Sequence, residues 1–402
     1  MKNILLPVLC LTASGLLAQN RSVAMGPSYA NDVFYALDSG TVSTAPASNW
    51  DLAFAIDAFD VTVRTNDGKG LRLFDLQTSL TDWATADTSG KMNNPLVNSE
   101  HDWSLGAFNY GATGHPNYGW GTYNSVTHDV VGTKVYALRW ADGSVKKVAI
   151  ESMLANGTVN VRVANLDGSG QQTLTASKGS FAGKKFGYFD LLAGTSLDRE
   201  PAANQYDLIF GKYVSMLPGN VPYAVTGVRT KDGVRSVKAQ GVDTNSVDLN
   251  LFALQDTSAA AIGYDWKTFV MTTFSWNLAD STAYLVQSTP TSPIYQLVFK
   301  TFGGASSGSV GFSQRMVSSL GMGDASIPEV VAYPNPGQDW LNVKLQSASV
   351  VRLTALDGRE VRHWMGSAGL NTWSTAGLPA GTYVLQVRNS EDQTATLRWQ
   401  CF

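Results

Sequence analysis

The chain has 402 residues and a formal net charge of −3, with 44% hydrophobic and 15% charged residues. This length exceeds that of one typical hydrophobic core and predicts two to four domains. The small negative charge, without runs of Lys or Arg, gives no electrostatic basis for binding nucleic acid or an anionic membrane. Short alternating apolar runs broken by Gly, Asn and Asp predict an all-β protein.

Residues 1–18 have the pattern of a signal peptide. Lys2 supplies a positive start, Ile4 to Leu17 is apolar, and Ala18 is a small residue suited to cleavage. The apolar run is shorter than the roughly 20 residues that span a bilayer, and no later segment is long and apolar enough to do so. We therefore expect a protein that reaches the periplasm and is then secreted or placed on the outer cell surface, with no transmembrane span.

The two cysteines bear on folding in the exported chain. Cys10 lies in the leader, so only Cys401 remains after cleavage. One cysteine excludes an intramolecular disulfide. The exported domains must therefore depend on the size of their hydrophobic cores.

A first β-rich module is predicted over residues 19–169. Asn49–Phe54 alternates as a half-buried strand, with Trp50, Leu52 and Phe54 on one face. Asp67-Gly68 is a hairpin signal, because both residues accept a positive φ. Further strands are expected over 135–140, 145–150 and 159–164.

A second module, residues 170–318, repeats the first. Tyr206–Phe210 repeats the aromatic, Asp, Leu and Phe order of Trp50–Phe54, and 228–233 matches 63–68 at five of six positions. This spacing is far above that of solenoid repeats and indicates domain duplication. We expect Asp51 and Asp207 to accept backbone hydrogen bonds in both copies, and Arg64 and Arg229 to lie on the solvated faces of their hairpins.

After a short linker, residues 319–328, the character of the chain changes. Short strands at even spacing between 329 and 402 predict a small immunoglobulin-like β-sandwich. Its notable runs are Tyr333-Pro334-Asn335-Pro336, Leu341-Asn342-Val343, Leu356 to Val361 and Gly377 to Tyr383.

In this order, behind a signal peptide, these runs resemble the type A C-terminal sorting domain of the type IX secretion system of Bacteroidota. The resemblance implies export across the outer membrane through contact between residues 329–402 and the secretion machinery. It also implies that the domain is removed and that the rest is released or anchored on the surface. The chain departs from the family at its end, Trp399-Gln400-Cys401-Phe402, where members often carry a basic residue.

The duplicated region resembles the HmuY-like family, known for a bacterial haemophore. The residues that carry this resemblance are Asn49–Phe54, Val63–Asn66 and Tyr136–Lys147. The resemblance implies haem as a cofactor to consider. In the haemophore, two side chains between the corresponding strand and hairpin hold the haem, and here that window contains Met92, His101, His115 and His128. None of the four lies in a segment that matches a ligand segment of the family.

The three histidines of this window are His101, His115 and His128. A neutral imidazole is a good ligand for haem iron or zinc. Their spacings of 14 and 13 residues match no helix-based metal motif, and the surrounding glycines predict a loop. Solvated loop histidines are the simpler interpretation. The nearby aromatic residues either line an apolar pocket or hold this loop on the sheet.

Residues 304–308 fit the Gly-x-Ser-x-Gly pattern of a nucleophile elbow. Such an elbow joins a strand to a helix, whereas 309–317 reads as another strand. A Gly/Ser hairpin is therefore expected, with no catalytic residues. The sequence favours a non-enzymatic binding protein, with haem as the ligand to test. A structural or adhesive surface protein is the alternative, and a hydrolase a remote one.

Overall fold

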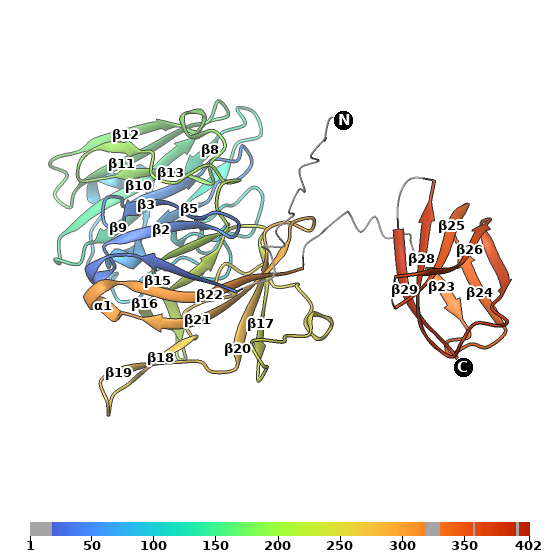
Figure 1. Cartoon of the computed structure of the whole chain (residues 1–402). Coiled ribbons are helices and arrows are strands. Elements are labelled where there is room, and N and C mark those ends of the chain that lie inside the picture. The colour runs from blue at the N-terminus through green and yellow to red at the C-terminus, as the bar shows by residue number, and fades with distance from the viewer. Residues whose placement is uncertain (1–17, 319–329, 357, 391–393) are drawn as a thin grey trace, which may run out of the picture. The chain divides into compact units, whose positions relative to one another are not determined.

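The computed structural model describes residues 18–318 and 330–402, except 357 and 391–393. The predicted signal peptide up to residue 17 and the linker 319–328 lie outside the described residues. The chain divides into two compact units, residues 1–318 and 319–402. The regular structure of both units is almost entirely antiparallel strands, so the all-β prediction is confirmed (Figure 1). In the described part of the chain, no helix is long and apolar enough to cross a membrane.

The first unit contains two β-sandwiches, each made of an outer and an inner sheet. The first sandwich has an outer sheet in the order β12-β11-β10-β9-β6, extended by β8 and β7 from β10, and an inner sheet in the order β14-β13-β4-β5. Its strands are β4 (Leu52–Ala55), β5 (Val63–Thr65), β6 (Arg72–Ser79), β7 (Gly121–Tyr123), β8 (Val130–Gly132), β9 (Lys134–Arg139), β10 (Val145–Met153), β11 (Thr158–Asn165), β12 (Gln172–Ser177), β13 (Phe186–Asp190) and β14 (Thr195–Leu197).

The second sandwich repeats this strand order. Its outer sheet runs β1-β22-β21-β20-β17 and its inner sheet β3-β2-β15-β16. The strands are β1 (Gln19–Ala24), β2 (Asn31–Ala36), β3 (Gly40–Pro46), β15 (Leu208–Leu217), β16 (Val221–Thr230), β17 (Arg235–Gln240), β20 (Thr282–Gln287), β21 (Ile294–Phe302) and β22 (Ser309–Ser318). A further hairpin, β18 (Lys267–Val270) and β19 (Ser275–Leu278), lies between β17 and β20 in the chain, as the β7–β8 hairpin lies between β6 and β9 in the first sandwich.

The register of strand pairing agrees between the two sandwiches. Between β10 and β11, Val148 pairs with Val163, and Leu297 pairs with Gln314 in the equivalent pair β21–β22. Between β6 and β9, Leu73 pairs with Leu138, and Ser236 pairs with Val286 in the equivalent pair β17–β20. The same bulge interrupts both central pairs, between Ile150 and Ser152 and between Phe299 and Thr301. A shared bulge and a shared register support the predicted duplication at the level of structure.

The sheets do not follow the predicted boundary between residues 169 and 170. Strands β1–β3, at the start of the chain, complete the second sandwich, with β1 paired to β22 and β2 to β15. Strands β12–β14, which follow the boundary, complete the first sandwich through β11 and β4. The two copies have therefore exchanged their first three strands. Figure 1 shows blue β2 and β3 beside β15 and the orange β21 and β22.

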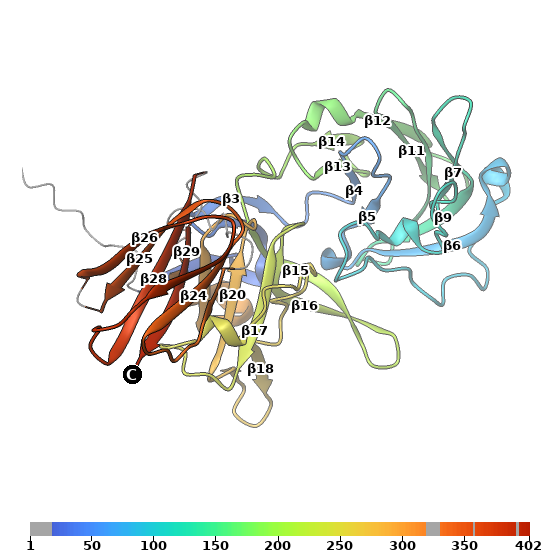
Figure 2. The same cartoon turned by 90° about the vertical axis from the view of Figure 1, so that its right-hand side faces the viewer.

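The two inner sheets pack face to face, so the layers run outer, inner, inner, outer. Leu52 and Phe54 of β4 point into the first core, while Ala53 and Ala55 join the cluster between the inner sheets. Trp50 packs in that second cluster, against Tyr188, and its echo Tyr206 is buried there too. The expectation that Trp50 shares a face with Leu52 and Phe54 was wrong, because β4 begins only at Leu52. Figure 2 shows β4, β5 and β13 between the outer strands and β15–β16.

The Asp67-Gly68 turn does not close a hairpin, contrary to the sequence prediction. Residues Asp67–Lys69 form a 3-10 turn that carries the chain from β5 in the inner sheet to β6 in the outer sheet. Gly68 is required by close approach, since a Cβ there would lie 2.4 Å from the carbonyl oxygen of Lys212. The remaining short helical segments are 27–29, 80–85, 107–109, 178–181 and 249–251 (3-10) and α1 (Gly304–Ser307).

The second unit, described from residue 330, is a β-sandwich of a three-stranded and a four-stranded sheet. Its core contains Leu341, Leu353, Leu385 and Trp399, together with the buried free thiol of Cys401. The strands are β23 (Val331–Tyr333), β24 (Trp340–Leu345), β25 (Ser349–Ala355), β26 (Glu360–Gly366), β27 (Gly369–Ser374), β28 (Gly381–Asn389) and β29 (Thr394–Cys401).

Candidate functional site

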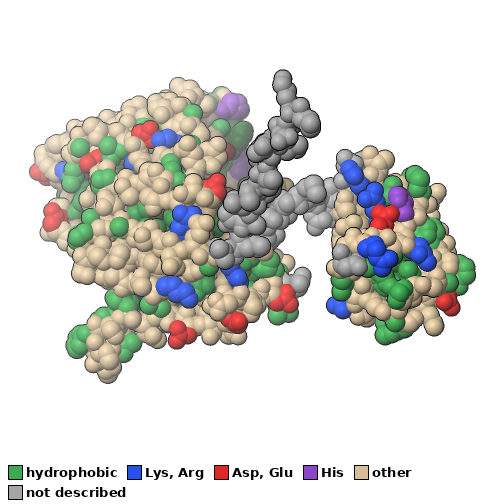
Figure 3. Space-filling model, in the orientation of Figure 1, with side chains coloured by type: hydrophobic (Ala, Val, Ile, Leu, Met, Phe, Trp, Pro, Cys, Tyr) green, Lys and Arg blue, Asp and Glu red, His purple; other side chains and the backbone are tan. Residues whose placement is uncertain are grey.

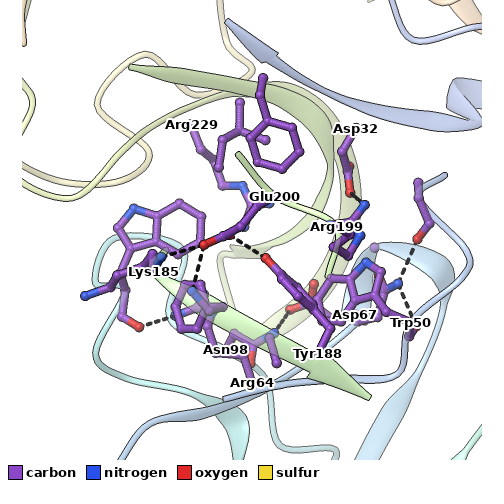
Figure 4. A pocket seen from close by; sticks show the side chains of 18 of the residues that line it. Asp32, Trp50, Arg64, Asp67, Asn98, Lys185, Tyr188, Arg199, Glu200 and Arg229 are labelled. Carbon is purple, nitrogen blue, oxygen red and sulfur yellow. Dashed lines mark hydrogen bonds and ion pairs between the residues drawn. The ribbon is translucent and has the colours of Figure 1, made fainter. Parts of the chain in front are cut away.

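An enclosed cavity of about 50 Å³ lies between the two inner sheets and is lined mostly by charged and aromatic side chains (Figure 4). Its size allows only a few water molecules. Arg64, Asp67 and Glu200 are buried around it, and the side chain of Arg199 is only 4% exposed. The expectation that Arg64 lies on a solvated face was wrong, because β5 is covered by the loop that contains Trp103.

Backbone carbonyls bind the Arg64 guanidinium by hydrogen bonds. It donates to the carbonyl oxygens of Ser99 (2.7 Å), Asp102 (2.9 Å) and Trp103 (3.1 Å). Burial, together with the nearby charge of Arg229, lowers the pKa of Arg64 to about 10. The cation thus holds the 99–105 loop against β5, a structural role.

The other buried charges of this cavity are also paired within the protein. Arg199 donates to Asp32 at 2.8 Å, and Glu200 accepts from the Tyr188 hydroxyl at 2.7 Å and from the amide of Phe186 at the same distance. Burial raises the pKa of Glu200. Arg199 Nε and Trp50 Nε1 have no hydrogen-bond partner among the described residues, so bound water fits this cavity better than a ligand of drug size.

His128 lies at the edge of a different, open cleft in the first sandwich. Its Nδ1 is 2.6 Å from the Tyr123 hydroxyl, and its backbone is left-handed at φ 63°. The cleft has a volume of about 560 Å³. Apolar residues form most of its wall, which consists of Ile56, Ala58, Phe59, Val61, Tyr118, Tyr123, His128, Val130, Met153, Leu154, Ala155, Asn156, Gly157 and Lys178. Figure 3 shows histidine atoms beside hydrophobic side chains at the upper right of the first unit.

His115 belongs to the same aromatic group but not to the wall of the cleft. Its ring centroid is 4.7 Å from that of Tyr123, and its Nδ1 is 3.2 Å from the Tyr118 hydroxyl. Both histidines thus engage a tyrosine through Nδ1, while no described residue contacts Nε2 of either ring by a hydrogen bond or an ion pair. Tyr123 joins the two imidazoles.

The two other predicted candidates lie elsewhere. His101 is exposed, with Nδ1 2.9 Å from Ser258 Oγ in the second sandwich. Met92 packs, partly buried, against the cluster around Phe74 and Trp83. The four residues predicted for haem are therefore not brought together. Within the described ranges, no three His, Cys, Asp or Glu side chains converge to hold a metal ion.

Sequence reasoning missed Phe59 and did not separate the aromatic residues of the 100–129 loop. Phe108 and Trp120 are buried in the first core, whereas Tyr118 and Tyr123 line the cleft. Phe59 is 93% exposed at the edge of the cleft. The one available signal was a phenylalanine in a loop between Asp57 and Asp60, where a polar residue is usual.

The Gly-x-Ser-x-Gly stretch joins β21 to β22, an antiparallel pair, as expected for a Gly/Ser hairpin. It contains the four-residue helix α1. The Ser306 hydroxyl donates to the carbonyl of Gly303 at 2.8 Å, and Ser307 contacts Ser309. In the described structure, no histidine contacts either serine.

Comparison with known proteins identifies one part of the chain. Residues 331–398 match the family of the secretion system C-terminal sorting domain. No curated protein matches the chain. The HmuY-like resemblance finds no support in these comparisons and stays a prediction.

Two solved structures from Porphyromonas gingivalis are weakly similar. PorZ, a bacterial surface component of the type IX secretion system, is 12% identical over 73% of this chain and 46% of that one, with a TM-score of 0.17. Dimeric latent PorU is 10% identical over 68% and 31%, with a TM-score of 0.16. The chain thus spans less than half the length of either, and similarity this low carries no inference about function.

Proposed function

We propose, on the premise that residues 331–398 are a sorting domain of the type IX secretion system, that this chain is a non-enzymatic binding protein and that its first sandwich binds haem. The sorting domain indicates a protein secreted to the cell surface or the extracellular space. The single observation that supports haem as the ligand is the position of His128. This residue lies at the edge of an apolar cleft, and its Nε2 has no partner among the described residues.

The chemistry of the cleft fits a flat, apolar, iron-bearing ligand. A volume of about 560 Å³ lies within the usual range of small-molecule sites. Ile56, Val61 and Met153 offer apolar surface to a macrocycle, and the exposed Phe59 ring can cover it. Bound haem would supply an iron atom that the imidazole of His128 could ligate.

Tyr123 orients His128, the residue proposed to bind the haem iron. Its hydroxyl contacts His128 Nδ1, which fixes the ring and leaves Nε2 for the iron, as partners of metal-bound histidines commonly do. His115, whose ring lies tilted against that of Tyr123, is a second donor within the same group. His101 and Met92 lie outside the cleft and take no part in this proposal.

Titration of residues 19–402 with haem, followed by absorbance, tests the proposal. We expect a saturable shift of the Soret band that is lost in His128→Ala and weakened in Tyr123→Phe. His101→Ala is the matched control, because His101 is an exposed histidine outside the cleft, and should leave the shift unchanged. The absence of a shift, or a shift that survives in the His115→Ala/His128→Ala double variant, would exclude haem binding here.

The adhesive alternative rests on the β18–β19 hairpin. Its exposed residues Phe269, Met271, Phe274 and Trp276 present an apolar surface, and the segment 268–277 contains no charged residue. Figures 1 and 3 show this hairpin projecting from the lower left of the first unit. If it is adhesive, Met271→Ser/Phe274→Ser should reduce attachment of cells that display the protein, while haem absorbance stays unchanged.

A further inference from the structure

A carboxylate at the same position of each sandwich has different surroundings in the two copies. Asp51 directly precedes β4, Asp207 directly precedes the equivalent strand β15, and both residues are buried. Asp51 Oδ2 accepts from the Leu191 amide at 2.7 Å, and Asp207 Oδ2 accepts from the Leu37 amide at 2.8 Å. These contacts confirm the predicted backbone hydrogen bonds and make the two sites comparable atom by atom.

In the first sandwich, two side chains occupy the other oxygen of the carboxylate. Asp51 Oδ1 accepts from Trp140 Nε1 at 3.0 Å and pairs with Lys69 Nζ at 2.6 Å. The same ammonium donates to the Ser48 carbonyl at 3.1 Å. Trp140 is itself buried, so an indole and an ammonium fill this site.

In the second sandwich, neither group is present. The register of β9 and β20 places Ser288 where the first copy has Trp140, and its hydroxyl donates to Asp207 Oδ1. Five residue steps separate Thr230 from Arg235, against seven from Thr65 to Arg72, and the shorter turn has no counterpart of Lys69. No Lys, Arg or His of the described residues forms an ion pair with Asp207.

A cavity of about 470 Å³ opens at this carboxylate. It is lined by Ala36, Leu37, Asp38, Ser39, Val42, Asn204, Gln205, Asp207, Ser288, Ser292, Pro293 and Tyr295. Asn204, which corresponds to Ser48 by its place three residues before the aspartate, also lines the cavity. The wall thus keeps the aspartate of the first copy but lacks the indole and the ammonium that contact it there.

The charges at the cavity favour a cation. Asp38 adds a second, exposed carboxylate at the rim. Burial raises the pKa of Tyr295, the charges of Asp38 and Asp207 raise it further, and Arg21 offsets part of this effect. One arginine against two carboxylates leaves the site acidic, and a buried carboxylate without a cation is unfavourable.

We propose that this cavity binds a primary amine attached to an apolar or aromatic body. The ammonium pairs with Asp207 Oδ1 and the Asn204 carbonyl, as Lys69 pairs with Asp51 and Ser48, and the body occupies the space that Trp140 fills in the first copy. The ligand is either a free amine or a lysine side chain of a peptide, which share this chemistry. The site lies in the second sandwich and is independent of the haem proposal.

Calorimetric titration of residues 19–402 with tryptamine tests this inference. We expect saturable binding that Asp207→Asn weakens at least tenfold, because the amide keeps the Leu37 hydrogen bond but not the charge. Ser288→Trp should abolish binding by restoring the indole of the first copy. Asp142→Asn, an exposed aspartate of the first sandwich, is the matched control and should bind as the unaltered protein does.

Two further probes separate charge from shape and identify the source of the amine. 3-Methylindole, which lacks the ammonium, should bind at least tenfold more weakly than tryptamine. Tighter binding of the peptide Gly-Lys-Trp than of tryptamine would indicate a peptide lysine, and the reverse a free amine. Failure of both amines to bind, or equal affinity for the Asp207→Asn variant with unchanged thermal unfolding, would overturn the proposal.

Discussion

Arg64 and Arg229, which occupy equivalent positions in the two sandwiches, both place their guanidinium groups over the ring of Trp103. The guanidinium carbons lie 5.1 and 4.7 Å from the ring centroid. Trp103 Nε1 also donates to the Thr230 carbonyl at 2.9 Å, in the second sandwich. One indole from the first copy therefore joins the two duplicated arginines and both inner sheets.

Replacement of Trp103 by alanine should destabilise the first unit by about 3–5 kcal/mol, the usual cost of removing a large buried aromatic side chain. The change removes two cation–π contacts and leaves the Thr230 carbonyl without its indole partner. Urea unfolding followed by circular dichroism measures the effect. Trp340→Ala, an exposed tryptophan of the second unit, is the control. A loss below about 1 kcal/mol would show that Trp103 does not hold the two sandwiches together.

Lys267 should make stability depend on pH in the alkaline range. Its ammonium is buried against Trp266, Trp276 and Phe302 and donates to the Thr226 carbonyl at 2.5 Å. Burial lowers its pKa from 10.5 to about 8, an effect that Asp265 only partly offsets. Between these two values the unfolded state binds more protons, so the free energy of unfolding should rise with pH, by about 3 kcal/mol in total.

Comparison with Lys267→Met isolates this contribution, because the tyrosines and other lysines titrate alike in both proteins. Urea unfolding at pH 7.5, 9 and 10.5 should show the unaltered protein gaining stability relative to the variant across this range. A constant difference between the two proteins would mean that the pKa of Lys267 is not depressed.

The sequence predicts the strands and the duplication because both depend on local patterns. The alternation in 135–140, 145–150 and 159–164 corresponds to β9, β10 and β11. The repeated Trp/Tyr-Asp-Leu pattern gave the correct equivalence of Asp51 and Asp207. What it could not predict is which copy each strand completes, because the alternation within a strand does not specify its partner strand.

The sites depend on contacts between residues far apart in the chain, and this is why the sequence predicted them only in part. His115 and His128 meet through Tyr123, but His101 faces Ser258, 157 residues away. The sequence pattern places Arg64 on the exposed face of a strand, but in the structure the 99–105 loop covers it. The cavity at Asp207 follows from Trp140 being replaced by Ser288, which only the aligned registers of the two copies make visible.

Removal of residues 330–402 should retain the protein in the periplasm if this domain is the export signal. The core of the second unit is separate from those of the first, so the truncated chain should fold normally. Immunoblots of periplasmic and culture fractions measure the outcome. A truncated protein that still reached the medium would contradict a sorting role.

The strand exchange predicts which fragments of the first unit fold. Residues 48–198 contain every strand of the first sandwich, including β12–β14. Residues 19–169, the module that the sequence suggested, lack those three strands and carry β1–β3 without their partners. We expect 48–198 to unfold cooperatively and to give dispersed amide NMR signals, and 19–169 to do neither.

The same fragments distinguish an exchange of strands from an ordinary tandem duplication. Without β12 and β13, β11 and β4 of the 19–169 fragment lose the neighbours they have in the whole chain. β1 and β2 occupy the positions in the second sandwich that β12 and β13 occupy in the first. In the 19–169 fragment they could replace β12 and β13 only by pairing with β11 and β4 instead of β22 and β15. Cooperative unfolding of 19–169 would show that the two sets of strands are interchangeable, and its failure beside a folded 48–198 would show that each set is specific for the core it completes.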